Sequence, residues 1–170
     1  MRTVSFFLLL VIFLKVKSEL IKLVLVRNGE SIWNQLNLFA GWTDIQLSEK
    51  GKEDSIKAGK LLRESGYIFD VCYTSFLKRS IQTAIYLLEE IDQLYIPIIK
   101  NYRLNGRHYG ALQGLNKKDT TDKYGKEKVK AWRKSYDYPP PSLKESDERN
   151  QPIKNSIGIT LKKIYPYMNQ

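Results

Sequence analysis

The 170-residue sequence contains only one cysteine and one histidine. A single thiol cannot form an internal disulfide, so the fold must be stabilised by its hydrophobic core alone. Cys72 lies in the alternating segment FDVCYTS, a pattern that favours a buried, unreactive side chain. His108, the lone histidine, excludes a two-histidine relay and a histidine-rich metal site, and no metal is expected. The sequence also has no Asn-x-Ser/Thr acceptor, so N-glycosylation is not expected.

A long hydrophobic run occurs only near the start of the chain. A short basic start precedes the apolar run Phe6–Leu14, and the small residues Val16 and Ser18 follow it. This pattern predicts a secretory signal peptide, residues 1–18, with cleavage after Ser18. The run is too short for a membrane span, and no second one follows. A signal anchor or a buried first strand is the alternative, which Lys15 and Lys17 disfavour because lysine is a poor core residue.

Acidic residues are too few to balance the basic ones, and the net charge is +10. Removing residues 1–18 would delete three basic residues and leave +7 on one secreted domain, residues 19–170, with no membrane span. A basic surplus suits a nucleic acid, an anionic surface or an anionic small ligand, or serves solubility alone. The lysines are spread along predicted helices, with no block of like charge and no nucleic-acid-binding module, so the sequence gives only weak support for binding of a polyanion.

Apolar periodicity predicts an α/β fold in which strands and helices alternate. The expected strands are Ile21–Val26, which reads as a parallel strand buried on both faces, Phe69–Thr74, and Ile96–Tyr102 with Pro97 marking an edge. The expected helices are Ser48–Ser65 with Gly66 as its stop, a helix from Ser75 that buries Ile81, Ala84, Ile85, Leu88 and Ile91, and Asp119–Arg133 with a break at Gly125 and an end at Pro139–Pro141. Thr160–Tyr165 is predicted to form a last amphipathic turn.

Basic residues recur where predicted strands end or predicted helices begin. They are Arg27, Arg79, Arg107, Lys117, and Arg133 with Lys134. Arginines that converge from separate loops can bind a doubly charged phosphate through paired charged hydrogen bonds. Scattered arginines can equally be solvated surface residues, and the spacing alone does not decide between the two. For His108, which lies in a loop, packing or hydrogen bonding is favoured over catalysis.

Five segments carry a resemblance to a known family. LVLVRNGESIWN, GWTDIQLSEKG, GYIFDVCYTSFLKRSIQTA, RHYGALQGLNK and AWRKSYDYPPP occur in order between Ile21 and Met168. Together they resemble the 2,3-bisphosphoglycerate-dependent phosphoglycerate mutases of the histidine phosphatase superfamily. The resemblance implies a phosphoglycerate mutase-like three-layer α/β fold with a mostly parallel sheet, incomplete at its C-terminal end. Members of the family move a phosphate between the 3- and 2-positions of glycerate through a phosphohistidine.

The resemblance also implies a substrate pocket. Its expected members are Arg27, Asn34, Ala40, Gly41, Arg79, Arg107, His108, Tyr109, Lys117, Arg133 and Lys134. Three features depart from the family. Asn28 stands where the family has its nucleophilic histidine, Gly106 stands where it has a glutamate proton donor, and the strand with its second pocket histidine is not found in this sequence. An amide nitrogen is conjugated with its carbonyl and cannot form the phosphoenzyme.

These departures predict a secreted, catalytically inactive relative that keeps an affinity for phosphoglycerate or another anionic ligand. Such a protein would need no cofactor, because 2,3-bisphosphoglycerate could not act as a phosphoryl donor. The alternatives are a residual mutase or phosphatase with another nucleophile, a basic extracellular protein that binds a macromolecule, and a truncated product with no stable function. The absent strand would leave Ile21–Val26 and Phe69–Thr74 each without a neighbour, which predicts self-association into a homo-oligomer.

Overall fold

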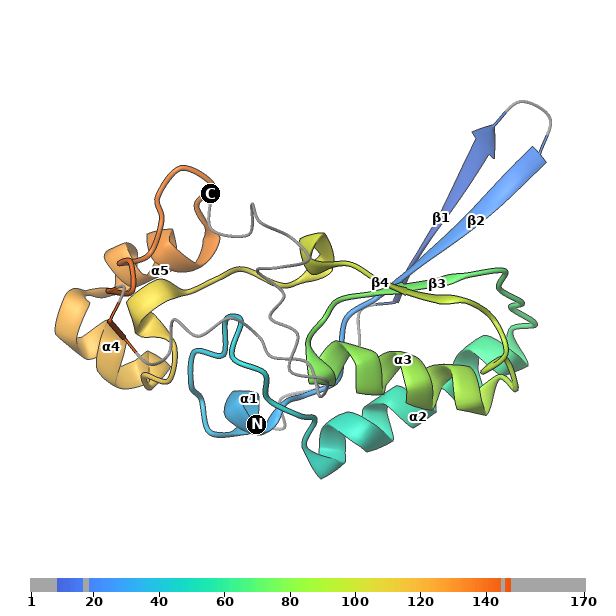
Figure 1. The fold of residues 1–170 in the computed structure, drawn as a ribbon, viewed down its shortest axis with the longest axis horizontal. Coiled ribbons are helices and arrows are strands. Elements are labelled where there is room, and N and C mark those ends of the chain that lie inside the picture. Colours follow the sequence, from blue (N-terminus) through green and yellow to red (C-terminus); the bar gives the residue numbers. More distant parts are fainter. Residues whose placement is uncertain (1–8, 17–18, 145, 148–170) are drawn as a thin grey trace. The chain divides into compact units, whose positions relative to one another are not determined.

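The structure is a computed structural model that describes residues 9–16, 19–144 and 146–147 (Figure 1). The chain forms two compact units, each built from two separate segments. The first unit comprises Met1–Ile32 and Gln46–Leu104, and the second comprises Trp33–Ile45 and Asn105–Gln170. The turn expected at Thr160–Tyr165 lies outside the described residues.

Helix α2 (Glu49–Glu64) has the ends that its sequence predicts. Ser48 is the N-cap, and its side chain accepts a hydrogen bond from the Gly51 N–H at 3.1 Å. At the other end Gly66 has φ +68 and donates to the Arg63 carbonyl, while Tyr67 donates to the Leu62 carbonyl. This pair of bonds satisfies carbonyls that the helix leaves without a partner, so the glycine stop is confirmed.

Helix α3 (Lys78–Glu90) begins later than predicted. The Ser75 hydroxyl accepts the Leu77 N–H at 3.1 Å, which forms a local turn before the helix. The buried face also differs in part from the prediction: Thr83, Leu87 and Leu88 point inward, whereas Ile85, expected inside, is 40% exposed. Leu88 and Ile91 are buried as predicted and Ile81 and Ala84 are half-buried, so the predicted stripe is right in part and only Ile85 is misplaced.

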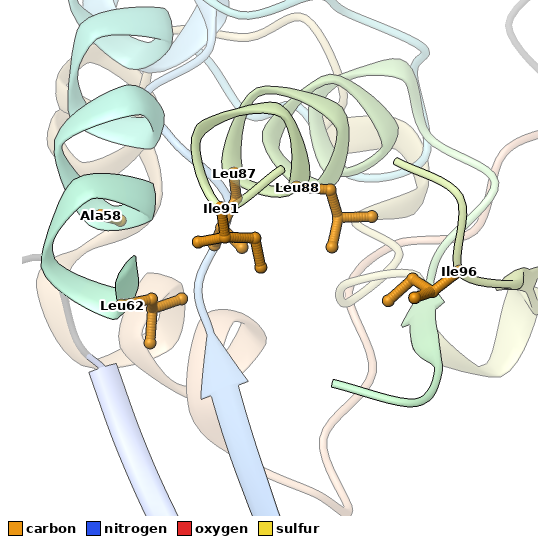
Figure 2. Close-up of a cluster of buried hydrophobic side chains, with 6 residues drawn as sticks. All are labelled: Ala58, Leu62, Leu87, Leu88, Ile91 and Ile96. Carbon is orange, nitrogen blue, oxygen red and sulfur yellow. The ribbon is translucent and has the colours of Figure 1, made fainter. Parts of the chain in front are cut away.

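The core of the first unit lies between α2 and α3, which pack side by side (Figure 1). Its buried side chains are Ala58, Leu62, Leu87, Leu88, Ile91 and Ile96. Figure 2 shows them coming from α2, from the end of α3 and from the loop that follows it. Half-buried side chains of three strands, among them Val24, Cys72 and Ile98, pack against this cluster. Apolar residues on strands and helices therefore share one core, as an α/β fold requires.

Strands β3 (Cys72–Thr74) and β4 (Ile98–Lys100) pair in parallel, as predicted, although both are shorter than expected. Phe69 explains the late start of β3. Its N–H donates to the Gln93 side-chain oxygen at 3.1 Å and its carbonyl accepts from the Gln93 amide nitrogen at 3.0 Å. A side chain thus satisfies the backbone groups that a strand partner would otherwise take.

Strand β2 (Glu19–Val26) corrects the prediction of a parallel strand buried on both faces. It pairs antiparallel with β1 (Leu9–Val16), with Leu9 opposite Val26 and Val16 opposite Glu19 (Figure 1). Ile21, Leu23 and Leu25 are exposed on one face of β2. A neighbouring apolar run provides a nearby partner for the backbone groups of β2. Strand β1 lies within the predicted signal peptide, residues 1–18, and cleavage after Ser18 stays a prediction.

The second unit is built from short elements. Helix α1 (Ile32–Gln35) leads into it, and the 3₁₀ turn η1 (Tyr102–Leu104) ends the preceding segment of the first unit. A second 3₁₀ turn, η2 (Gly110–Leu112), precedes the helices α4 (Lys117–Tyr124) and α5 (Lys126–Lys134).

The predicted helix break at Gly125 is confirmed. This glycine has φ +83, a conformation that favours glycine, and it separates α4 from α5. Helix α4 starts earlier than expected, because Asn116 caps it by accepting the Lys118 and Asp119 N–H groups. Helix α5 ends at Lys134, before the prolines that were expected to end it. A small core of Phe39, Leu112, Val129 and Trp132 joins these parts.

Candidate functional site

The loop that follows β2 is tied to the first turns of α3 within the first unit. The Gly29 N–H donates to Thr83 Oγ1 at 3.0 Å, and Thr83 Oγ1 donates to the Arg79 carbonyl at 2.8 Å. Arg27 is exposed directly after the strand, while Arg79 is buried in the first turn of α3. The Thr83 hydroxyl therefore connects the loop that carries Arg27 to the first turn of α3, which carries Arg79.

The same loop packs on the amino end of α2. The Ser48 N–H donates to the Glu30 carbonyl at 2.9 Å, and the Ser48 hydroxyl donates to Glu30 Oε1 at 3.0 Å. A Cβ on Gly51 would clash with the Glu30 backbone, and one on Gly29 would clash with the Gly51 carbonyl. Two glycines are needed where these backbones approach so closely, and the loop is held against the helix as a result.

Asn28 is half-buried at the middle of this loop. Its side-chain nitrogen donates to the Gly29 carbonyl at 2.8 Å. The amide thus acts as a hydrogen-bond donor within the loop, and neither of its polar atoms is a nucleophile for phosphoryl transfer.

In the second unit, the loop with Ala40 and Gly41 packs on the segment before α4. Gly41 is buried with φ +54, and a Cβ there would clash with the Gln113 side chain. The Trp42 N–H donates to Gln113 Oε1 at 2.7 Å. The Lys117 N–H donates to the Asn37 carbonyl at 2.9 Å, which places the start of α4 beside the same loop. The loop with Ala40 and Gly41 and the start of α4 at Lys117 therefore belong to one hydrogen-bonded part of the second unit.

His108 packs against Trp42. The two rings meet edge to face with centroids 5.5 Å apart, and Trp42 Nε1 donates to the Gly106 carbonyl at 2.7 Å. His108 Nδ1 accepts the Gly110 N–H at 2.9 Å. A neutral imidazole whose Nδ1 accepts must carry its proton on Nε2. The side chain keeps an exposed edge, yet partial desolvation lowers its pKa below the ordinary 6.5, so the neutral form is favoured.

Arg107 and Tyr109 flank His108 and face different neighbours. The Tyr109 ring meets Phe39 edge to face at 5.1 Å and joins the small core of the second unit. Arg107 Nε donates to the Trp132 carbonyl at 2.8 Å, and its Nη2 donates to the Tyr138 carbonyl at 3.1 Å. Arg107 is thereby anchored to the backbone at the end of α5.

The remaining predicted site residues are exposed. Asn34 lies on α1, and Arg133 and Lys134 lie in the last turn of α5. Gly106 is also exposed, and a Cβ on it would have no heavy atom within 4 Å. The structure thus describes Arg27, Asn28 and Arg79 in the first unit, and the other members of the predicted site in the second.

Sequence reasoning did not single out three residues that organise these parts: Trp42, Thr83 and Gln113. Trp42 lies inside a segment that carries the family resemblance, which was a usable signal. Thr83 and Gln113 are buried polar side chains, 4% and 3% exposed, that hydrogen-bond to distant loops. Both also lie inside segments that carry the family resemblance, but nothing local in the sequence indicates which distant loop each one contacts.

Comparison with known proteins decides the family. The model of the histidine phosphatase superfamily (branch 1) matches residues 23–152. The chain belongs to the histidine phosphatase superfamily. Members of this superfamily use no metal, in agreement with the sequence. Within the described parts of the chain, no group of three or more histidine, cysteine or acidic side chains could hold a metal ion.

Relatives of this superfamily member include two 2,3-bisphosphoglycerate-dependent phosphoglycerate mutases. That of Lachnoclostridium phytofermentans is 50% identical, over 88% of this chain and 66% of its own length. That of Treponema denticola is 56% identical, over 75% of this chain and 52% of its own length. The chain therefore spans about half to two thirds of the length of these two relatives.

A phosphoglycerate mutase structure from Bacillus anthracis shares the fold, with a TM-score of 0.54 and 24% identity over 62% of this chain and 48% of that one. The phosphoglycerate mutase-like fold that the sequence predicts is thereby confirmed. No helix in the parts of this superfamily member that the structure describes is both long and apolar enough to cross a membrane.

Proposed function

We propose that this protein is a secreted, non-catalytic member of the phosphoglycerate mutase group that binds phosphoglycerate or a related phosphorylated acid. The observation that carries the proposal is the hydrogen bond from the Gly110 N–H to His108 Nδ1. It holds the only histidine of the sequence with a proton on Nε2, so the outer nitrogen has no lone pair for attack on phosphorus.

The position that the resemblance assigns to the nucleophile supports the same conclusion. Asn28 occupies it, and its amide nitrogen is engaged with the Gly29 carbonyl. Gly106, at the position of the proton donor, has no side chain to transfer a proton. The nucleophile and the proton donor serve successive steps, and the loss of either one costs orders of magnitude in rate. 2,3-Bisphosphoglycerate can then act only as a ligand.

Ligand binding is supported by the basic residues that remain. Arg133 and Lys134 are exposed cations in the last turn of α5, and each charge-assisted hydrogen bond to a phosphate contributes about 1.5–3 kcal/mol. A few such contacts suffice for affinities between millimolar and micromolar.

The test has two parts that use the purified chain. Calorimetric titration with 3-phosphoglycerate should give a dissociation constant that Arg133→Ala weakens. Arg63→Ala, which removes an exposed arginine from α2, is the matched control and should have no effect. Incubation with 2,3-bisphosphoglycerate should leave the intact mass unchanged. A phosphoryl adduct that disappears in His108→Gln would contradict the proposal and favour a residual mutase or phosphatase.

A second candidate function is the binding of an anionic polymer. Residues 117–134 contain eight basic and three acidic residues, and every basic side chain among them except Lys117 is exposed. Such a surface binds polyanions with strong salt dependence. Binding of heparin that is indifferent to Arg27→Ala, together with no heat from 3-phosphoglycerate, would favour this function instead.

A further inference from the structure

The carboxyl end of α5 presents two cations of the predicted site. Arg133 and Lys134 are the last two residues of this helix, and both are exposed. The last carbonyls of a helix have no partner within it and must be satisfied from outside. The Ser135 N–H donates to the Ala131 carbonyl at 2.9 Å, which leaves the Trp132 carbonyl to another donor.

Arg107 supplies that donor. Its Nε donates to the Trp132 carbonyl at 2.8 Å and its Nη2 donates to the Tyr138 carbonyl at 3.1 Å. One side chain thus joins the end of α5 to the segment that leaves it. A positive charge at a helix C-terminus is also favoured by the helix dipole.

Both ends of this bridge are held by further contacts. Trp132 is 4% exposed and belongs to the small core with Phe39. On the other side, the Ala111 N–H donates to the Pro141 carbonyl at 2.7 Å, so the segment after Tyr138 is bonded to η2 as well. The loop that carries Arg107 is therefore tied to the last turn of α5 and to the segment that follows it.

The geometry at Arg107 differs from that of a phosphate ligand. A guanidinium binds an oxyanion in a bidentate manner through two parallel N–H groups on one edge. In Arg107 the edge formed by Nε and Nη2 is used for two backbone carbonyls, which ties the guanidinium to the end of α5 and leaves only the Nη1–Nη2 edge for another acceptor. By contrast, the guanidinium of Arg133 donates to no backbone carbonyl of the described residues, and the side chain is exposed.

We propose that Arg107 is a positioning residue that acts through Arg133 and Lys134 and is not itself a direct ligand of the phosphate. This inference rests on the proposed function, since it concerns the same phosphorylated ligand. Lysine cannot replace arginine in this role. Its ammonium is a point charge on a flexible stem and cannot reproduce the planar fork that spans two carbonyls.

A double-mutant cycle tests the proposal by calorimetric titration with 3-phosphoglycerate. Arg107→Ala and Arg107→Lys should each weaken binding about tenfold or more, the factor that one charge-assisted hydrogen bond carries. In a background that carries both Arg133→Ala and Lys134→Ala, Arg107→Ala should weaken binding less than about twofold, because the residues through which it acts are already gone. Equal factors in both backgrounds, or full binding by Arg107→Lys, would overturn the positioning role.

A second measurement separates this inference from the proposed function. Hydrogen exchange without ligand should be faster for the Ser135 N–H and the last turn of α5 in Arg107→Ala and Arg107→Lys. Arg103→Ala, which removes an exposed arginine from η1, should leave it unchanged. If the wild-type chain binds no 3-phosphoglycerate, the proposed function fails. The hydrogen-exchange rates would still report whether Arg107 holds the end of α5 through the Trp132 and Tyr138 carbonyls. Unchanged exchange in both Arg107 variants would overturn the inference whether or not ligand binds.

Discussion

Substitution of Gly51 by alanine tests how the loop with Arg27 and Asn28 is held. Gly51 lies in the first turn of α2, where an alanine in open space would stabilise the helix by about 1 kcal/mol. Here the added Cβ would clash with the Glu30 carbonyl oxygen, which is backbone and cannot rotate away. Forcing a methyl group into such a contact costs about 1–3 kcal/mol.

Relief of the clash has a further cost. Moving Glu30 away would break the bond from the Ser48 N–H to the Glu30 carbonyl, which is 2.9 Å long. That loss of about 1 kcal/mol offsets the gain in helix propensity. We therefore expect Gly51→Ala to lower the free energy of unfolding by about 1–3 kcal/mol. For a chain of this length, the Tm falls by about 2–4 °C per kcal/mol.

Thermal unfolding followed by circular dichroism, at fixed pH and protein concentration, measures the effect. Gly106→Ala is the control, because its Cβ would have no heavy atom within 4 Å and its Tm should stay within the error. A Gly51→Ala variant that is as stable as the wild type, or more so, would refute the reasoning. The loop would then have room to move, and its contacts with α2 would not hold it.

Two further predictions concern pH and association. Partial burial lowers the pKa of His108 below 6.5, so the folded chain disfavours the protonated imidazole. The stability that this group contributes is present above pH 6.5 and is lost as the pH falls through the lowered pKa. Urea unfolding at a series of pH values should show that the free energy of unfolding declines over this range, and that the decline is smaller in His108→Gln. We also expect self-association, because Leu23 and its apolar neighbours are exposed on β2, which among the described residues pairs with β1 alone. Light scattering should show a mass that rises with concentration and falls in Leu23→Ser, but not in the control Leu61→Ser on α2; a monomer at all concentrations would contradict this expectation.

The features that the sequence by itself determined are local ones. Ser48 and Gly66 mark the ends of α2, because a capping hydroxyl and a residue at positive φ satisfy nearby backbone groups of the same helix. The break at Gly125 between α4 and α5 has the same local origin. The family, too, was recognisable from short segments in a fixed order along the chain, because such a resemblance is read from the sequence without any knowledge of distant contacts.

Tertiary structure decided the features that depend on distant partners. Antiparallel pairing of β2 with β1 replaces the predicted parallel arrangement, because an apolar strand pattern does not specify which strand satisfies its backbone. The contacts of Arg107 are a second example: the family resemblance implied that it is a phosphate ligand, and only the fold shows that it donates to the Trp132 and Tyr138 carbonyls. A guanidinium can bind either kind of oxygen, and only the three-dimensional arrangement determines which of them lies within reach.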